Sequence, residues 1–133
     1  MTDPNNPCIF CDLKKQDIIY ENDYAFVSYD SYPVSKFHSL IIPKRHIKNF
    51  FHLNDKELNA CNELIKKIKS KIENDDNLVE GFNLGTNAGS VAGQTIMHCH
   101  IHLIPRRRGD VENPQGGVRG VIPLKQHYLR KSK

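Results

Sequence analysis

Apolar residues in the middle of the chain recur every three or four positions, the spacing of a helix that buries one face. Asn54 is a favourable N-cap, and Glu57 stands where a capping box requires it. The spacing therefore predicts one long helix that begins after Asn54 and ends in the polar stretch 74–77. Lysines fill its opposite side, so the apolar face is expected to cover a sheet. That face comprises Leu58, Cys61, Leu64, Ile65, Ile68 and Ile72.

Shorter apolar runs on both sides of this helix predict β-strands. The runs 18–21 and 24–29 are separated by Asn22-Asp23, a turn signal, and are expected to form a hairpin. Further strands are expected at 39–42, at 81–87 and in a histidine-rich stretch that ends before Pro105. This order of elements indicates an α+β fold, in which an antiparallel sheet carries a helix on one face.

The histidine-rich stretch alternates polar and apolar side chains with a period of two, the period of a strand. His98, His100 and His102 are expected to project from one face, each about 7 Å from the next. Pro105 is expected to end the strand, because proline cannot donate to a ladder. The other face would point into the core and carry Met97, Cys99, Ile101 and Leu103.

Three imidazoles in a row suit chemistry better than a plain solvated face, because the β-branched and aromatic residues that stabilise sheets are missing there. One interpretation is a metal site, since neutral imidazole is a common metal ligand. The other is nucleophilic or acid–base chemistry near pH 7, which suits an unperturbed pKa of about 6.5. A single metal held by all three is disfavoured, because three alternate strand positions span about 14 Å. A polar face that happens to be rich in histidine is the remaining alternative.

Length and composition narrow the classes of function. The chain has 133 residues, enough for one domain over 1–133, and is 38% hydrophobic and 26% charged, which fits a globular chain. No apolar run approaches the roughly 20 residues of a membrane span, so no membrane partner is expected. The N-terminus lacks the features of a signal peptide, and a cytoplasmic location is the default expectation.

The net charge of +4 is concentrated at the C-terminus. From Arg106 onward there are eight Lys or Arg and two Asp or Glu, whereas the preceding residues hold eleven and thirteen. A basic segment directly after the histidines would attract a phosphate-bearing substrate. Nucleic acid is not expected as a partner, because no aromatic stacking platform accompanies the charge.

The segment from His98 to Ile104 resembles the signature of the histidine triad (HIT) family, in which three histidines alternate with apolar residues. Gly-Gln-Thr before it and Pro-Arg after it extend the likeness. The block from His38 to His46 resembles a second family pattern, in which His precedes an apolar strand and Pro-Lys/Arg-x-His follows. Asn87-Ala88-Gly89 resembles the family's Asn-x-Gly turn. The likeness covers about residues 8–106 and leaves 107–133 as a basic C-terminal extension.

The resemblance implies a five-stranded antiparallel sheet with one long and one short helix, a homodimer, and cleavage of nucleotides at the α-phosphate. It implies that His100 attacks phosphorus to form a nucleotidyl–histidine intermediate, and that His102 and its neighbours donate a proton to the leaving group and neutralise the phosphate. His38 would set the environment of the nucleophile, with a polar strand-end role as the alternative. The chemistry of the residues agrees, because a histidine nucleophile must be neutral and fixed in one tautomer.

The resemblance also implies substrate-binding residues. Gln94 and Thr95 match positions that hydrogen-bond the phosphate or the leaving group, and Asn87 would contact the phosphate or fix the loop. Gly93 lets the backbone approach closely. Asp30 matches a position that holds the ribose hydroxyls, with a loop cap as the alternative reading. The base would be enclosed by three apolar residues for which a simple core role is the alternative, namely Ile9, Phe10 and Leu13.

Cys8 and Cys11 form a C-x-x-C pair, which is a metal or redox signal. Disulfides are not expected in a chain without a secretion signal. Some HIT proteins complete such a site with two histidines, which here are His46 and His98, and two thiolates with two imidazoles suit tetrahedral zinc. The resemblance thus implies a structural Zn²⁺ and no organic cofactor. A pair of cysteines without a metal is the alternative.

Three functions stay open on the sequence. The first is a nucleotide hydrolase or transferase acting on diadenosine polyphosphates, nucleoside phosphoramidates or aminoacyl adenylates, with water or inorganic phosphate as the second acceptor. The second is a metallohydrolase, and the third is a non-catalytic nucleotide-binding protein with a structural zinc. The run 106–108 and the segment 116–119 resemble a bacterial branch described as diadenosine polyphosphate hydrolases. Phe37 departs from the family, because many members have Gly before the His.

Overall fold

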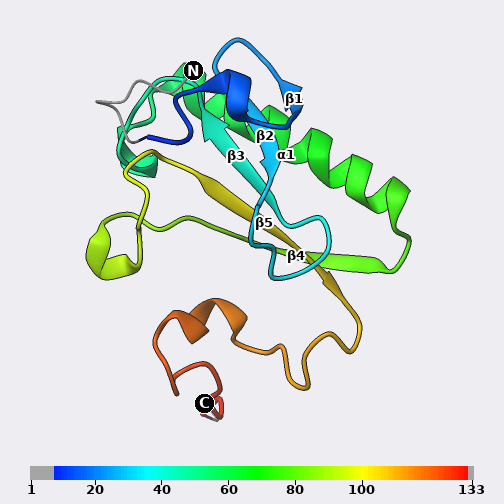
Figure 1. The fold of residues 1–133 in the computed structure, drawn as a ribbon. Helices are drawn as coiled ribbons and strands as arrows, with labels where there is room; N and C mark the ends of the chain where they lie inside the picture. The colour runs from blue at the N-terminus through cyan, green and yellow to red at the C-terminus, as the bar shows by residue number, and fades with distance from the viewer. Residues whose placement is uncertain (1–7, 132–133) are drawn as a thin grey trace.

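The computed structural model describes residues 8–131, and in this part of the chain it contains one five-stranded antiparallel sheet (Figure 1). Asn22 closes the first hairpin by accepting hydrogen bonds from the backbone N–H groups of Tyr24 and Ala25. The predicted α+β fold is confirmed. In the order β1-β2-β3-β5-β4, the strands are β1 (Ile18–Glu21), β2 (Ala25–Tyr29), β3 (Ser39–Pro43), β5 (Ile101–Arg107) and β4 (Val79–Gly85).

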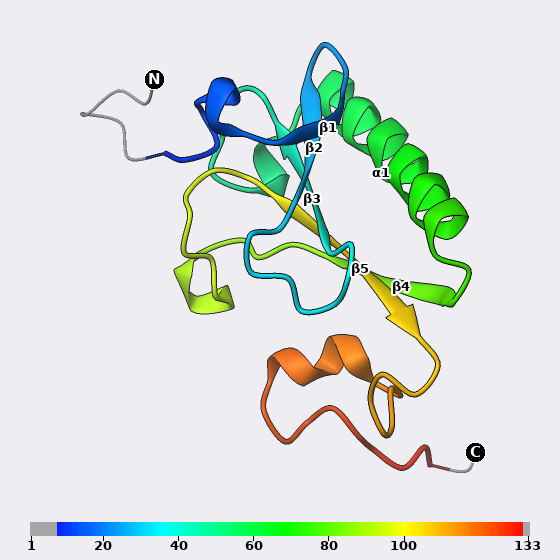
Figure 2. The same cartoon turned by 45° about the vertical axis from the view of Figure 1, so that its right-hand side comes forward.

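Helix α1 (Asp55–Asp75) lies across one face of the sheet (Figure 2). The predicted capping box is present: the Asn54 side chain accepts from the Glu57 N–H, and the Glu57 carboxylate accepts from the Asn54 N–H. Glu57 is buried because Arg45 satisfies its carboxylate at 2.8 and 2.9 Å, whereas Leu58 lies off the buried stripe and is 42% exposed. The core under the helix comprises Ala25, Val27, Ile41, Ala60, Cys61, Leu64, Ile68, Ile72, Val79, Ile101 and Leu103.

Strand β5 differs from its prediction at both ends. His98 and His100 precede the strand, and Pro105, predicted to end it, lies inside it opposite Phe82 of β4. The Pro105 carbonyl accepts from the Ser35 hydroxyl, so its ring nitrogen points toward the side where β3 is no longer paired, and no ladder hydrogen bond is lost. Met97, predicted to enter the core, is 41% exposed.

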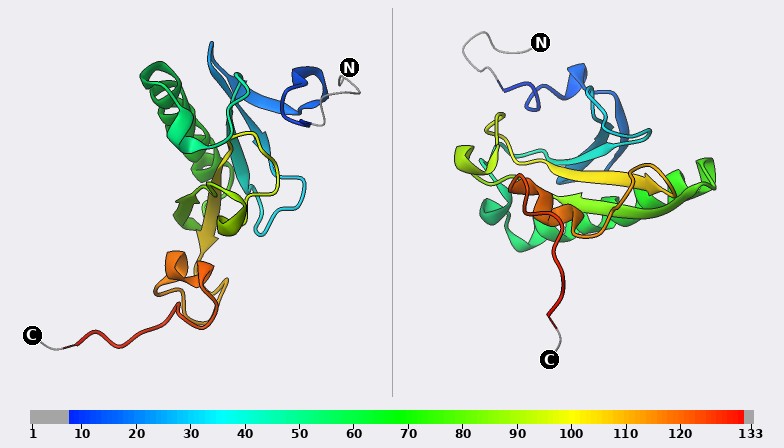
Figure 3. Two further views of the ribbon diagram at one scale, coloured as in Figure 1. Left: turned by 90° about the vertical axis from the view of Figure 1, so that its left-hand side faces the viewer. Right: turned by 90° about the horizontal axis from the view of Figure 1, so that it is seen from below.

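The opposite face of the sheet carries the N-terminal segment and the loop between β2 and β3, as the edge-on view in Figure 3 shows. A second apolar cluster forms there, because alternate side chains of a strand point to opposite faces. Among residues 8–131, α1 is the one α-helix, and the other helical segments are 3₁₀ turns that include Leu13–Lys15. The buried members of this second cluster are Cys8, Phe10, Phe26, Leu40 and Ile42.

The C-terminal extension lies beside the sheet and outside the core (Figures 1 and 3). It leaves β5 through a turn in which Asp110 pairs with Arg106 at 2.8 Å, and it contains the 3₁₀ helix Gly117–Val121. Its apolar side chains, such as Val118 and Leu124, are largely exposed. No helix within residues 8–131 has the length and apolar character needed to cross a bilayer.

Candidate active site and metal centre

A cavity of about 600 Å³ opens on the sheet face opposite α1. Its floor is formed by side chains of β2, β3 and β5, and its walls by the N-terminal turn and by the loops that follow β2 and β4. The fold therefore brings together residues from three separate parts of the chain, 9–16, 28–40 and 87–102. The residues predicted for catalysis and substrate binding that line it are Ile9, Phe10, Asp30, His38, Asn87, Gly93, Thr95, His100 and His102.

His100 is held in one tautomer by the backbone. Its Nδ1 lies 2.8 Å from the His98 carbonyl oxygen, and because a carbonyl can only accept, Nδ1 carries the proton. The Nε2 of neutral His100 therefore keeps its lone pair. The Thr86 hydroxyl donates to the His100 carbonyl at 2.7 Å, and the ring packs against Phe10 and His102 at centroid distances of 5.2 and 5.3 Å. A histidine nucleophile requires a neutral ring with a lone pair on the attacking nitrogen.

His38 and His102 form a directional hydrogen-bonded pair. The Val34 backbone N–H donates to His38 Nδ1 at 3.1 Å, so the proton of neutral His38 is on Nε2. That Nε2–H donates to His102 Nδ1 at 2.9 Å, which leaves the proton of neutral His102 on its own Nε2. The Asp30 carboxylate lies 3.5 Å from His38 and 3.8 Å from His102. We call Asp30, His38 and His102 the Asp–His cluster; it can offer an N–H donor beside His100.

Burial keeps this pair of histidines neutral. Desolvation lowers the pKa of His38, and the Asp30 carboxylate opposes that shift only in part. Desolvation also lowers the pKa of His102, and repulsion from His100 and His38 lowers it further against the same carboxylate. Both rings are therefore neutral near pH 7, which is the condition under which the tautomers above hold.

Two residues predicted to bind substrate lie outside the cavity lining. Gln94 is buried, and its amide accepts from the Gly89 N–H and donates to two backbone carbonyls. Gln94 thus holds the loop that presents Gly93, whose φ of +93° is a conformation that glycine adopts readily. Leu13 packs against the second apolar cluster.

A second group of side chains gathers next to this cavity. Cys8, Cys11, His46 and His98, here called the Cys–His cluster, have ligand atoms within 4.8 Å of one another. Cys8 Sγ lies 3.2 Å from His98 Nδ1, and Cys11 Sγ lies 3.1 Å from His46 Nδ1. Tetrahedral zinc with bonds of about 2.0–2.3 Å spaces its ligands about 3.3–3.8 Å apart, so small shifts would complete a shell. The four residues predicted to ligate a metal are close enough to hold one.

The hydrogen bond made by the His98 ring nitrogen that faces away from the cysteines also favours metal binding. Its Nε2 lies 2.7 Å from the Pro43 carbonyl oxygen, so Nε2 carries the proton and Nδ1 turns its lone pair toward the thiols. Desolvation lowers the pKa of His98, which keeps that lone pair available. Sulfur and imidazole donors suit Zn²⁺, whereas Ca²⁺ and Mg²⁺ prefer oxygen ligands. The Phe10 ring packs edge-on against His98 at 5.9 Å.

Sequence reasoning missed several residues of the cavity. Lys15, Gln16, Tyr32 and Val34 line it, and Tyr32 is 88% exposed at its rim. Val34 contacts His38 through its backbone N–H, which leaves no trace in the pattern of side chains. The one available signal was proximity: Tyr32 and Val34 closely follow Asp30, which had been predicted to bind ribose.

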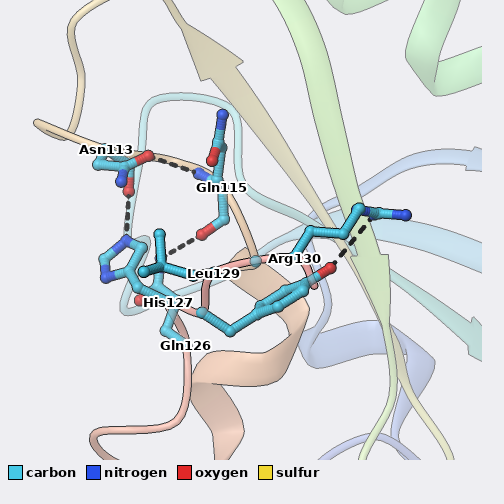
Figure 4. Close-up of a pocket in the computed structure, with 8 residues that line it drawn as sticks. Asn113, Gln115, Gln126, His127, Leu129 and Arg130 are labelled. Carbon is cyan, nitrogen blue, oxygen red and sulfur yellow. Dashed lines mark hydrogen bonds between the residues drawn. The ribbon is translucent and has the colours of Figure 1, made fainter. Parts of the chain in front are cut away.

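A separate cavity of about 770 Å³ lies within the C-terminal extension (Figure 4). Two segments of the extension enclose it: His127 donates to the Asn113 carbonyl at 3.0 Å, and Gln126 donates to the Gln115 carbonyl at 3.4 Å. None of the residues predicted for catalysis, substrate or metal lines it. The basic run before it is also largely neutralised, because Arg106 and Arg107 pair with acidic partners and only the third arginine is exposed.

The comparisons with known proteins agree with the geometry. The model of the HIT domain matches residues 13–109, so the chain belongs to the histidine triad family. An uncharacterized HIT-like protein of Methanocaldococcus jannaschii is 39% identical over 110 residues, which cover 79% of this chain and 83% of that protein. A solved structure of a HIT family protein from Bacillus anthracis has a TM-score of 0.71 and 30% identity, covering 96% of this chain and 82% of the other.

Two further relatives carry names that describe an activity. A Candida albicans protein named adenosine 5'-monophosphoramidase is 33% identical over 107 residues, which cover 75% of this chain and 70% of that protein. An Arabidopsis thaliana protein named adenylylsulfatase is 35% identical over 109 residues, which cover 79% of this chain and 55% of that longer protein.

Proposed function

We propose that this protein is a nucleotide hydrolase or transferase that cleaves at the α-phosphate through a nucleotidyl–histidine intermediate on His100. One observation carries the proposal: His100 lines a cavity with Nδ1 bonded to a carbonyl, so its Nε2 lone pair is available. A neutral imidazole in this state is nucleophilic near pH 7 without a separate base. We assign hydrogen bonding to the leaving group to His102 and the alignment of His102 to His38.

The proposed reaction consists of two displacements at phosphorus. In the first, His100 Nε2 bonds to the α-phosphorus and the bond from phosphorus to the leaving atom breaks; that atom accepts a hydrogen bond from the His102 Nε2–H and takes its proton from solvent. In the second, a water oxygen bonds to phosphorus and gives its proton to solvent, while the phosphorus–nitrogen bond to His100 breaks. A nucleoside monophosphate leaves, His100 returns to its neutral state, and His102 keeps its Nε2 proton throughout. With inorganic phosphate in place of water, the same steps give a nucleoside diphosphate.

The lining of the cavity suggests how a nucleotide would lie. Ile9 and Phe10 offer an apolar wall for the base. The Asp30 carboxylate is an acceptor that suits ribose hydroxyls, although one of its oxygens already accepts from a backbone N–H at 2.8 Å. Asn87, Gly93 and Thr95 lie in the loops around His100 and are assigned to the phosphate and leaving group. Gln94 and Leu13 are assigned a supporting role behind this surface.

The names of two relatives suggest which leaving groups to test first. The names of the Candida albicans and Arabidopsis thaliana relatives describe adenylates with a small group on the α-phosphorus. We therefore propose nucleoside phosphoramidates and adenylyl sulfate as first substrates, and diadenosine polyphosphates on the weaker likeness of the extension. We further propose a single domain with its core at about residues 8–106, acting as a homodimer.

We also propose that the Cys–His cluster holds a structural Zn²⁺. When bound, the metal would link the N-terminal turn to the segment before β5, and it takes no part in the steps above. The supporting observations are the four mutually close ligand atoms and the His98 tautomer set by the Pro43 carbonyl.

The test of the proposed function is product analysis on a substrate panel. Purified protein is incubated with adenosine phosphoramidate, adenylyl sulfate or diadenosine tetraphosphate, with and without inorganic phosphate, and nucleotides are separated by chromatography. We expect AMP from at least one substrate, and ADP in the phosphate arm if phosphate is the second acceptor. Measurable AMP binding without turnover of any substrate would contradict the proposal and favour a non-catalytic nucleotide-binding protein.

A further inference from the structure

The backbone turn that delivers His38 to the cavity contains an unusual residue. Phe37 has a φ of +71°, in the left-handed region that glycine favours and aromatic residues rarely occupy. The Phe37 ring packs against Tyr29 at a centroid distance of 5.7 Å and is partly buried. Such a conformation persists only when the surroundings hold it in place. A neighbouring group must therefore hold Phe37 at positive φ.

Arg107, at the end of β5, contacts the turn at the peptide group between Lys36 and Phe37. Its guanidinium donates to the Lys36 carbonyl at 3.0 Å. The Lys36 carbonyl belongs to the peptide plane between Lys36 and Phe37, and rotation of that plane is what changes the φ of Phe37. Fixing the carbonyl therefore fixes the strained dihedral angle. On the other side, the Ser39 hydroxyl donates to the Phe37 carbonyl at 2.8 Å.

Arg107 is itself anchored to helix α1. It donates to the Asp76 carboxylate at 2.9 and 3.1 Å, and both side chains are mostly buried. Asp76 is the C-cap of α1, and its other carboxylate oxygen accepts from the Leu78 N–H at 3.0 Å. A guanidinium can serve two acceptors at once because its donors form a rigid fork. Neither Arg107 nor Asp76 lines the cavity, so any effect on chemistry must pass through the backbone.

We propose that Arg107 is a positioning residue for His38. By holding the Lys36 carbonyl it keeps Phe37 at positive φ, and this keeps His38 Nδ1 against the Val34 N–H and His38 Nε2 against His102. Release of the carbonyl lets the peptide rotate and His38 lose its fixed tautomer. The kinetic part of this inference rests on the proposed function; the structural part does not.

The experiment compares Arg107→Ala with Arg108→Ala. Arg108 belongs to the same run, has an 86% exposed side chain and pairs with Glu80 at 3.2 Å, so it is a matched control. We expect Arg107→Ala to lower kcat about tenfold with little change in KM, and Arg108→Ala to leave both unchanged. Added guanidinium ion should restore much of the lost rate in Arg107→Ala alone. If Arg107→Ala folds poorly, Arg107→Lys, which keeps the charge but not the fork, should show a smaller loss in the same direction.

A readout independent of turnover is the ¹⁵N NMR spectrum of the histidine rings. His38 in the parent should show a protonated Nε2 and an unprotonated Nδ1, and Arg107→Ala should average the two signals. An unchanged His38 spectrum together with an unchanged kcat would overturn the proposal. A parent without turnover would instead contradict the proposed function, and the NMR comparison would still test Arg107.

A second comparison tests the role of strain. In Phe37→Gly the positive φ is not strained, so the turn does not need the hydrogen bond from Arg107. Adding Arg107→Ala in this background should lower kcat less than about threefold. In Phe37→Ala, which removes the ring but keeps a Cβ, adding Arg107→Ala should still cost about tenfold. An equal loss in both backgrounds would show that Arg107 does not act through the φ of Phe37, and would overturn the inference.

Discussion

The Cys–His cluster and the Asp–His cluster each bring their ligand atoms within 4.8 Å of one another, yet their hydrogen bonds run in opposite senses. In the first, the far nitrogen of His98 donates to the Pro43 carbonyl, so the near nitrogen keeps a lone pair for a metal. In the second, the far nitrogen of His38 accepts from the Val34 N–H, so the near nitrogen carries a proton. Compactness alone therefore does not separate a metal site from a site that offers an N–H donor.

A metal at the Asp–His cluster would have to displace that proton. The proton could move only to His38 Nδ1, where it would oppose the Val34 N–H. The Cys–His cluster meets no such conflict. The partner of the distal ring nitrogen is thus the feature on which we base the proposed structural role of one cluster and the proposed catalytic role of the other.

The largest effect is expected from His100, which stands between the two clusters. His100→Gln should lower kcat by at least about ten-thousandfold, because the attacking lone pair is lost, while changing the free energy of unfolding by less than about 1 kcal/mol. Steady-state kinetics, nucleotide binding and urea unfolding measure the three quantities. His127→Gln, a change at an exposed histidine of the extension, is the control and should behave as the parent. Parent-like turnover in His100→Gln would remove the proposed nucleophile.

The next effect separates the clusters by metal content. Protein purified without added metal should contain one zinc per chain, and Cys8→Ala should contain none and lose roughly 3 kcal/mol of stability. Elemental analysis and thermal unfolding with and without chelator provide the measurements. Chelator should lower the melting temperature of the parent and leave that of Cys8→Ala unchanged. Two zinc ions per parent chain would contradict the interpretation that the Asp–His cluster does not bind a metal.

His38 offers a sharper test of the Asp–His cluster. His38→Ala removes the donor to His102 Nδ1 and should lower kcat about a hundredfold. His38→Gln can place an amide N–H near the same point and should lose only about tenfold. Zinc content should be that of the parent in both variants. Equal losses in the two variants would mean that the hydrogen bond to His102 is not what His38 contributes.

The smallest effect concerns pH. The folded-state pKa values of His38 and His102 are lowered by burial below the unfolded value of about 6.5. Between the folded and unfolded values the unfolded chain binds more protons, so stability falls as the pH falls below about 6.5. Urea unfolding at pH 7, 6 and 5 should show this decline, and His102→Asn should make it shallower. A stability that rises toward pH 5 would show that the rings are not buried as neutral groups.

Local rules predicted much of the fold. The capping box at Asn54 fixed the start of α1, and the turn at Asn22 fixed the first hairpin. The predictions were wrong where a partner distant in the sequence determines whether a side chain is buried or a residue stays within a strand. Glu57 is buried in place of Leu58 because Arg45 neutralises it, and Pro105 stays within β5 because β3 has already ended on that side. Neither partner is visible in a window of neighbouring residues.

The candidate site divides in the same way. The period of the histidines and the likeness to the HIT family named the residues, including a Cys–His set whose members lie far apart in the sequence. The roles within the set depend on backbone groups, namely the carbonyls of His98 and Pro43 and the N–H of Val34. Every residue has a backbone carbonyl and every residue other than proline has an N–H, so sequence alone could not single them out.

Rapid-quench mass spectrometry of a single turnover can detect the proposed nucleotidyl–histidine intermediate itself. Enzyme is mixed with a substoichiometric adenylate, quenched in base, because phosphorus–nitrogen bonds are labile in acid, and digested. We predict an adenylyl adduct on the peptide that contains His100, forming and decaying at the rates of turnover and absent from His100→Gln. Complete conversion of substrate with no adduct on that peptide at any time would contradict the account.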